Sequence, residues 1–234
     1  MSASVIYHFY AAKGEETLIA LHFDPRTYRL QLPTDPVLPE WAKLNFNRCP
    51  NCTLADSEEY CPAAAALAQF LPCFESRFSY EKTTLQVETG NRTIVAQTTF
   101  QHGIAGVIGL AMATSGCPRT LFLRPMARTH LPLATEEETV FRSLAIHLLS
   151  QYVAQSGSGG APVSLSLQRL KEDYGHLSHV NAAMAERIRT AIERDAAVNA
   201  VIILDSFAMI TPENIDTGFE DIRALFVVEE GVGV

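Results

Sequence analysis

Four of the five cysteines lie in sequence contexts that suit metal ligation. Cys49 and Cys52 form a Cys-x-x-Cys pair, whose spacing lets two thiolates on one tight turn reach a single metal ion. Cys61 follows in the same polar loop, and Cys117 lies far along the chain. Three of these cysteines precede a proline, which stiffens a turn and leaves nearby amides free to point at sulfur. We call Cys49, Cys52, Cys61 and Cys117 the four-cysteine set and predict that it holds one metal ion.

Two other interpretations of the cysteines stay open. Free cysteines often serve as small buried apolar residues, which suits Cys73 between Pro72 and Phe74 best. Cys49 and Cys52 could also form a redox dithiol, although the βαβ context of that motif is missing. Four thiolates suit zinc or an iron–sulfur cluster. We predict zinc as the commoner metal of isolated sites, with an iron–sulfur cluster as the alternative cofactor.

A second candidate site follows Cys117 in a segment broken by prolines. Arg124, Arg128 and His130 fall within seven residues of one another. Two guanidinium groups and an imidazole could hold an anionic small molecule or a carboxylate of a partner protein. The alternative is ordinary surface ion pairing with the acidic run 136–138 and a histidine that only forms hydrogen bonds.

Composition limits the classes of partner. The chain has 234 residues, of which 47% are hydrophobic, and its net charge is -8. Such a chain can bury a real core, and its acidity disfavours nucleic acid and anionic lipid. The longest apolar stretch, 103–113, is too short to span a bilayer, and residues 1–9 do not look like a signal peptide. We therefore expect a cytoplasmic protein with reduced cysteines that binds neither membrane nor nucleic acid.

The elements that must position these residues begin with β structure. Alternating apolar residues around polar turns predict one hairpin over residues 5–23 and a second over 83–100, around Gly90-Asn91. Short strands are also expected at 28–32 and 41–48. The cysteine loop lies between the hairpins, and a short helix should begin after Pro62.

The second half of the chain is predicted to be mostly helical. One helix is expected over 104–114, closed by Ser115-Gly116, and another after the capping-box pair Thr135 and Glu138. Thr211-Pro212 predicts the start of a last helix. The fold class is thus α+β, with N-terminal antiparallel hairpins and a cysteine loop followed by helices. We expect one domain over 1–234, with a sub-boundary only at the Ser/Gly segment 156–160.

Four runs of residues give the chain a resemblance. They are CPNC at 49–52, YCP at 60–62, ATSGCP at 113–118 and RPMARTHLPLA at 124–134. These runs resemble a bacterial family of uncharacterised proteins, a domain of unknown function, over nearly the whole chain. Thr53 departs from a proline expected there, which affects the stiffness of the loop rather than ligation. The resemblance implies a bacterial cytoplasmic protein and includes the four-cysteine set but not Cys73.

The functional hypothesis is a zinc-binding protein with a non-catalytic ligand-binding or regulatory role. The alternative is an iron–sulfur or thiol-dependent redox enzyme, with a thiolate acting near His130. No glycine-rich phosphate loop, nucleophile elbow or HExxH helix occurs in the sequence. The sequence specifies neither the substrate nor the oligomeric state.

Overall fold

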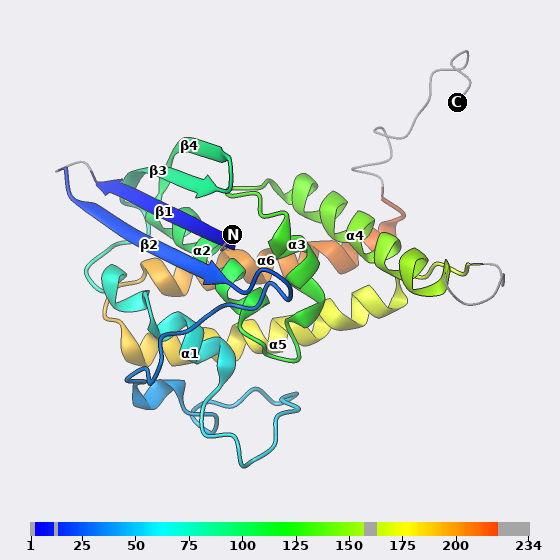
Figure 1. Ribbon diagram of the computed structural model, residues 1–234, viewed down its shortest axis with the longest axis horizontal. Coiled ribbons are helices and arrows are strands. Elements are labelled where there is room, and N and C mark those ends of the chain that lie inside the picture. Colours follow the sequence, from blue (N-terminus) through cyan, green and yellow to red (C-terminus); the bar gives the residue numbers. More distant parts are fainter. Residues whose placement is uncertain (1–2, 12–13, 157–162, 220–234) are drawn as a thin grey trace.

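A four-stranded antiparallel sheet forms the N-terminal part of the protein (Figure 1). The structure is a computed structural model that describes residues 3–11, 14–156 and 163–219. Both predicted hairpins are confirmed. They consist of β1 (Ala3–Ala11) with β2 (Glu16–Phe23), and of β3 (Lys82–Thr89) with β4 (Arg92–Thr99). Antiparallel pairing of β1 with β3 joins the hairpins in the order β2-β1-β3-β4.

The two additional strands predicted between the hairpins are wrong. In the first segment only Leu30 pairs, through a single bridge to Phe23, because Tyr28 has a positive φ of 56° that turns the chain. The second segment begins with a 3-10 turn, η1 (Glu40–Ala42), and adds only one bridge, from Lys43 to Tyr60. These segments therefore form the loop that carries the first cysteines.

Apart from the sheet and the loops, the described chain forms helices, which confirms the α+β class. They are α1 (Pro62–Ala68), η2 (Leu71–Phe74), α2 (Phe100–Thr114), η3 (Leu121–Leu123), α3 (Arg124–Arg128), α4 (Glu136–Ser156), α5 (Gln168–Ala191) and α6 (Ala196–Thr217). The predicted capping box opens α4: Thr135 N–H donates to Glu138 Oε2 at 2.8 Å, and Glu138 N–H donates to Thr135 Oγ1 at 3.1 Å.

The predicted helix start at Thr211-Pro212 is wrong. Helix α6 continues through Pro212, and Thr211 is fully buried with its hydroxyl donating to Phe207 O at 3.2 Å. Packing of α6 against α5 and α2 outweighs the local preference of proline for a first turn. The predicted continuation beyond residue 219 and residues 157–160 of the Ser/Gly segment lie outside the described residues.

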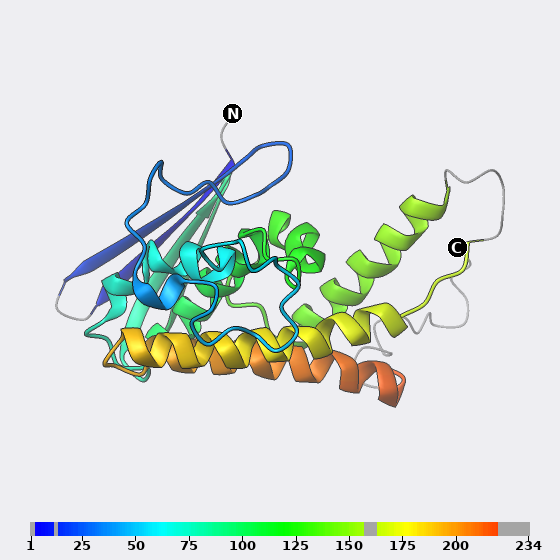
Figure 2. The ribbon, with the colours of Figure 1, turned by 90° about the horizontal axis from the view of Figure 1, so that it is seen from below.

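The elements lie in three layers (Figure 2). The sheet covers one side, α1 and α2 lie behind it, and the long antiparallel pair α5 and α6 closes the opposite side. Tyr7 and Phe9 point from β1 into the core, and both are fully buried. Gly103 of α2 allows close approach, because a Cβ there would lie 2.6 Å from the Phe9 ring. The core includes side chains from before and after the Ser/Gly segment.

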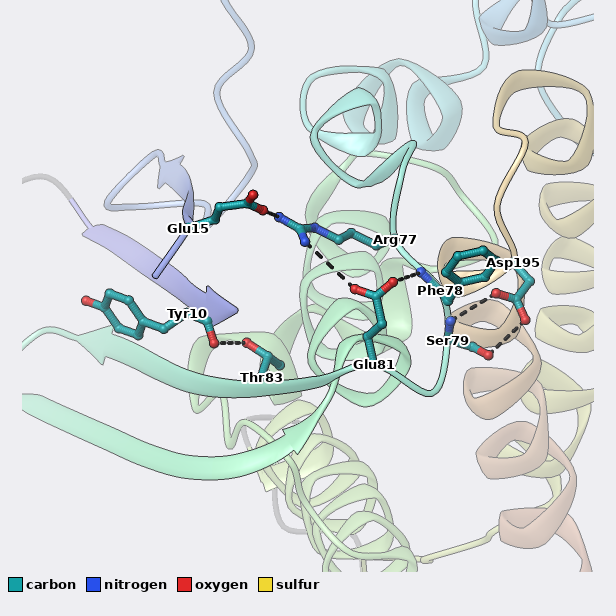
Figure 3. A network of polar contacts seen from close by, with 8 residues as sticks. All are labelled: Tyr10, Glu15, Arg77, Phe78, Ser79, Glu81, Thr83 and Asp195. Carbon is teal, nitrogen blue, oxygen red and sulfur yellow. Dashed lines mark hydrogen bonds and ion pairs between the residues drawn. The ribbon is translucent and has the colours of Figure 1, made fainter. Parts of the chain in front are cut away.

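Polar contacts tie the segment before β3 to its surroundings (Figure 3). Arg77 forms ion pairs with Glu15 at 2.7 Å and with Glu81 at 3.8 Å. Ser79 donates to Asp195, directly before α6, through its N–H at 2.9 Å and its hydroxyl at 2.8 Å. The Ser79 N–H is also the main cause that lowers the pKa of Asp195. The sheet is thereby anchored to the turn between α5 and α6.

Helix α6 is also the one helix in the described ranges that is long and apolar enough to cross a membrane. The most apolar stretch of 18 residues in α6 has a mean hydropathy of 1.3, and 39% of that stretch is buried. Core helices of soluble proteins meet the same criterion, and here α6 packs between α2 and α5.

Candidate functional site

Three separate segments carry the four-cysteine set. Cys49 and Cys52 lie on the loop after η1, in a tight turn closed by the Cys52 N–H donating to Cys49 O at 3.1 Å. Cys61 is the N-cap residue of α1, and its N–H donates to Ala42 O at 2.9 Å. Cys117 follows α2 and is buried, as is Cys61. The elements and backbone hydrogen bonds around the four cysteines therefore fix their positions without a metal ion.

The turn after α2 places Cys117 and orients amides toward it. Gly116 has a φ of 94°, a left-handed conformation that favours glycine, and a Cβ there would also displace the Arg29 guanidinium, 2.7 Å away. Burial raises the pKa of the Cys117 thiol, and hydrogen bonds from the backbone N–H groups of Arg119 and Thr120 to the sulfur oppose this rise. Such amides stabilise a thiolate, which is the form that binds metal.

Hydrogen bonds lock the Cys-x-x-Cys turn between two helical elements. Arg119, just after Cys117, donates from Nε to Asn51 O at 2.8 Å. Asn51 in turn donates from Nδ2 to His176 O of α5 at 2.9 Å. The loop of Cys49 and Cys52 is thus fixed both to the turn of Cys117 and to α5.

The thiols of the set lie close enough to affect one another. Burial raises the pKa of Cys49 to about 11, and the nearby thiols of Cys61, Cys117 and Cys52 contribute to the rise in that order. As they stand, however, the His, Cys, Asp and Glu side chains of the described residues form no group of three or more that could hold a metal ion. The fifth cysteine, Cys73, is exposed on η2. The fold gathers the set into one neighbourhood without converging the sulfur atoms on a point.

A buried arginine faces this neighbourhood. Arg187 of α5 is 1% exposed, and it donates to Trp41 O, Lys43 O and Leu44 O at 2.5, 2.7 and 3.0 Å. Its Nε is buried and has no hydrogen-bond partner within the described residues. Burial lowers its pKa, and the thiols of Cys61, Cys49 and Cys52 act in the opposite direction. The thiols are the groups that could supply negative charge to this cation.

The three residues of the predicted anion site take different positions. Arg124 is half-buried at the start of α3, and the exposed Arg128 lies over the Tyr28 ring, 5.6 Å from its centroid. His130 points inward and shares a hydrogen bond with the buried Tyr7 hydroxyl. Burial, together with the charge of Arg142, lowers the pKa of His130 to about 3. Joint binding of an anion by the three residues stays a prediction.

Comparison with known proteins identifies the family. A family model described as a domain of unknown function (DUF6901) matches residues 5–227. The chain belongs to this family. The predicted resemblance to a domain of unknown function, over nearly the whole chain, is therefore confirmed. No curated protein and no solved structure matches the chain. Because the description of DUF6901 names no activity, the chemistry of this member must be inferred from its own geometry.

Sequence reasoning missed two residues of this DUF6901 protein, Arg187 and Arg142. A signal for Arg187 exists, because it lies three residues after Met184 and seven after Val180, on the apolar face of α5. A charged residue on such a face needs partners of opposite charge or carbonyl groups. Arg142 gives no such signal, because α4 buries polar Thr139 and Ser143 beside Val140 and Leu144.

Proposed function

We propose that the four-cysteine set binds one zinc ion in a structural, non-catalytic role. The ion would join three parts of the chain that are far apart in sequence: the loop after η1, the start of α1 and the turn after α2. Four thiolates and no further ligand make a closed tetrahedral site, which is the pattern of structural zinc. A closed site leaves no open position for a substrate or water.

The observation that carries this proposal is the buried guanidinium of Arg187. A buried charge without a counter-charge is strongly unfavourable, and among the described residues no carboxylate forms an ion pair with Arg187. Protonated thiols are neutral, whereas zinc tetrathiolate is negatively charged, because metal binding removes the thiol protons. Metal binding would thus supply the negative charge that Arg187 lacks.

The surroundings of the sulfur atoms support the same proposal. The amides of Arg119 and Thr120 donate to the Cys117 sulfur, and Arg48 donates to Cys52. Hydrogen bonds of this kind tune and orient metal ligands. Ligation requires the four sulfur atoms to converge on one centre, and the thiols of Cys61, Cys117 and Cys52 already lie near enough to Cys49 to raise its pKa. Reduced thiols as metal ligands also fit a cytoplasmic protein.

Metal content of anaerobically purified protein tests the proposal. We expect about one zinc per chain in the wild type and loss of zinc in Cys52→Ser. Cys73→Ser is the matched control and should keep its zinc, because Cys73 is exposed and outside the set. Chelation of zinc from the wild type should lower its melting temperature.

Three results would overturn the proposal. One is a wild type without zinc whose melting temperature does not change when zinc is added. Another is equal zinc content in the wild type and Cys52→Ser. The third is a brown protein with iron and sulfide, which would assign the same ligands to an iron–sulfur cluster.

A further inference from the structure

A cavity of about 470 Å³ lies on the side of α2 that faces α6. Its walls come from the end of β4, from α2, from the segment of η3, α3 and the loop before α4, and from α4, α5 and α6. Most of the lining is apolar, including Leu131, Leu177, Leu204 and Phe207. Both the volume and the character of the lining fall within the range of small-molecule sites, which is about 300–1,000 Å³.

One lining residue carries a permanent charge. Among the described residues that line the cavity, Arg142 is the only Lys, Arg, Asp or Glu. Burial lowers its pKa, and the charge of Glu138, one helical turn earlier, opposes this shift. No carboxylate of the described residues is close enough to form an ion pair with Arg142. A cation at the wall of an apolar cavity attracts an anion more strongly than it would in water, because the surroundings screen it less.

The guanidinium of Arg142 has donors to spare. Its Nη2 donates to Met126 O at 3.1 Å and to Thr129 O at 2.6 Å, which caps the end of α3. Nη1 and Nε form no hydrogen bond with the described residues, and neither atom is among the buried polar atoms that lack a partner. Nη2 is therefore held by the protein, while the N–H groups of Nη1 and Nε remain available to donate a charge-assisted hydrogen bond to a carboxylate.

His130 completes the polar end of the cavity without adding charge. It lines the cavity near Arg142, and its Nε2 is engaged by Tyr7. The low pKa of His130 keeps the ring neutral near pH 7. Of Arg142 and His130, only Arg142 is therefore charged near pH 7, and its one positive charge matches one negative charge rather than two.

We propose that this cavity binds an apolar monocarboxylate, with the carboxylate on Arg142 and the hydrocarbon part among the side chains of α2 and α6. Polyanions such as phosphate esters fit poorly, because burying a second negative charge in this apolar lining has no compensation. The site is separate from the four-cysteine set, so the proposal stands whether or not zinc binds.

Isothermal titration of the full chain tests the proposal with three probes below their micelle-forming concentrations. Decanoate is the model ligand, decylammonium has the same chain with the opposite charge, and acetate carries the carboxylate alone. We expect decanoate to bind at least about tenfold more tightly than either of the others. Arg142→Met should weaken the binding of decanoate by about tenfold or more, as expected for loss of a charge-assisted hydrogen bond. It should not weaken the binding of decylammonium.

A second variant covers the case in which Arg142→Met does not fold. Ala134→Phe keeps Arg142 but adds a large side chain to the cavity wall, and it should weaken the binding of decanoate by about tenfold or more. Equal affinity of the wild type for decanoate and decylammonium would overturn the proposal, as would decanoate binding unchanged in Ala134→Phe. Failure of decanoate to bind the wild type would also overturn it and would leave zinc content, measured separately, unaffected.

Discussion

The region of the four-cysteine set and the region of the cavity each contain an arginine without an ion pair to the described residues, Arg187 in the first and Arg142 in the second. Arg187 is enclosed by the loop after η1, and its hydrogen bonds go to three carbonyls that lie close together in sequence. Arg142 is half-buried, uses one nitrogen to cap α3 and leaves the others without a partner in the described structure. Neither guanidinium forms an ion pair with a carboxylate among the described residues, although the charge of Glu138 acts on Arg142. The groups nearby differ: thiols lie beside Arg187 and an apolar cavity lies beside Arg142.

This difference indicates which region serves stability and which serves binding. A cation sealed from solvent must find its counter-charge inside the protein, and thiolates around a fixed metal ion provide one permanently. A cation at the wall of a cavity can be neutralised by a ligand that comes and goes. Substitutions of Arg187 and Arg142 test this division, and the pH dependence of stability tests the neutral state of His130 at the cavity.

The largest effect is expected for Arg187→Met. It leaves the carbonyls of Trp41, Lys43 and Leu44 unpaired and, under the proposed zinc site, the thiolates uncompensated. It should therefore lower the free energy of unfolding by about 3–5 kcal/mol in urea titrations. Arg189→Met, at an exposed position of the same helix, should change it by less than about 0.5 kcal/mol. If the thiolates are the counter-charge, chelation of zinc should reduce the gap between the two variants. A gap that does not depend on zinc would contradict that role.

A smaller effect is expected from acid. The folded pKa of His130 is about 3, whereas a histidine in an unfolded chain has a pKa of about 6.5. Between these values the unfolded chain binds a proton that the folded protein does not, so stability falls as the pH drops below about 6.5. The loss from this group should reach about 1–2 kcal/mol at pH 5.

Urea titrations at pH 7 and pH 5 measure this loss by comparing variants. His130→Gln removes the titrating group, so its stability should depend less steeply on pH than that of the wild type. His22→Gln, at an exposed position on β2, should keep the slope of the wild type. Equal slopes for the wild type and His130→Gln would show that His130 titrates normally in the folded protein.

The smallest effect on stability is expected for Arg142→Met. It removes the hydrogen bonds to Met126 O and Thr129 O, but Thr129 is exposed and water can replace the donor there. The expected loss is about 1 kcal/mol in urea titrations. A loss as large as that of Arg187→Met would mean that Arg142 is as structural as Arg187, and the division between the two regions would fail.

Local patterns predicted local structure well. The two hairpins, the capping box at Thr135 and Glu138 and the helix ending before Gly116 all follow from interactions within a few residues, and all are present. Failures occur where distant packing decides. Thr211-Pro212 has the local form of a helix start, yet α6 runs through it against α5 and α2. Tyr28 has a residue type typical of strands, but its positive φ makes a turn.

The candidate sites show the same limit. Cysteine spacing selected residues from three segments that the fold does gather, because Cys-Pro turns are recognisable locally. The partners of those thiols are not recognisable, since Arg187 lies 70 residues beyond Cys117 and reaches them only through the packing of α5. The cavity has no sequence signature at all, because its lining comes from seven elements and consists mostly of ordinary apolar residues.

The pairing of β1 with β3 has a consequence for synthesis on the ribosome. The first hairpin is complete at Phe23, but its partner strand begins only at Lys82, and the helix that covers Tyr7 and Phe9 ends at Thr114. At a translation rate of about 5–20 residues per second, the nascent hairpin exposes its aromatic face for several seconds before that cover is made. Chaperones that hold emerging chains would meet this protein first at its N-terminal strand.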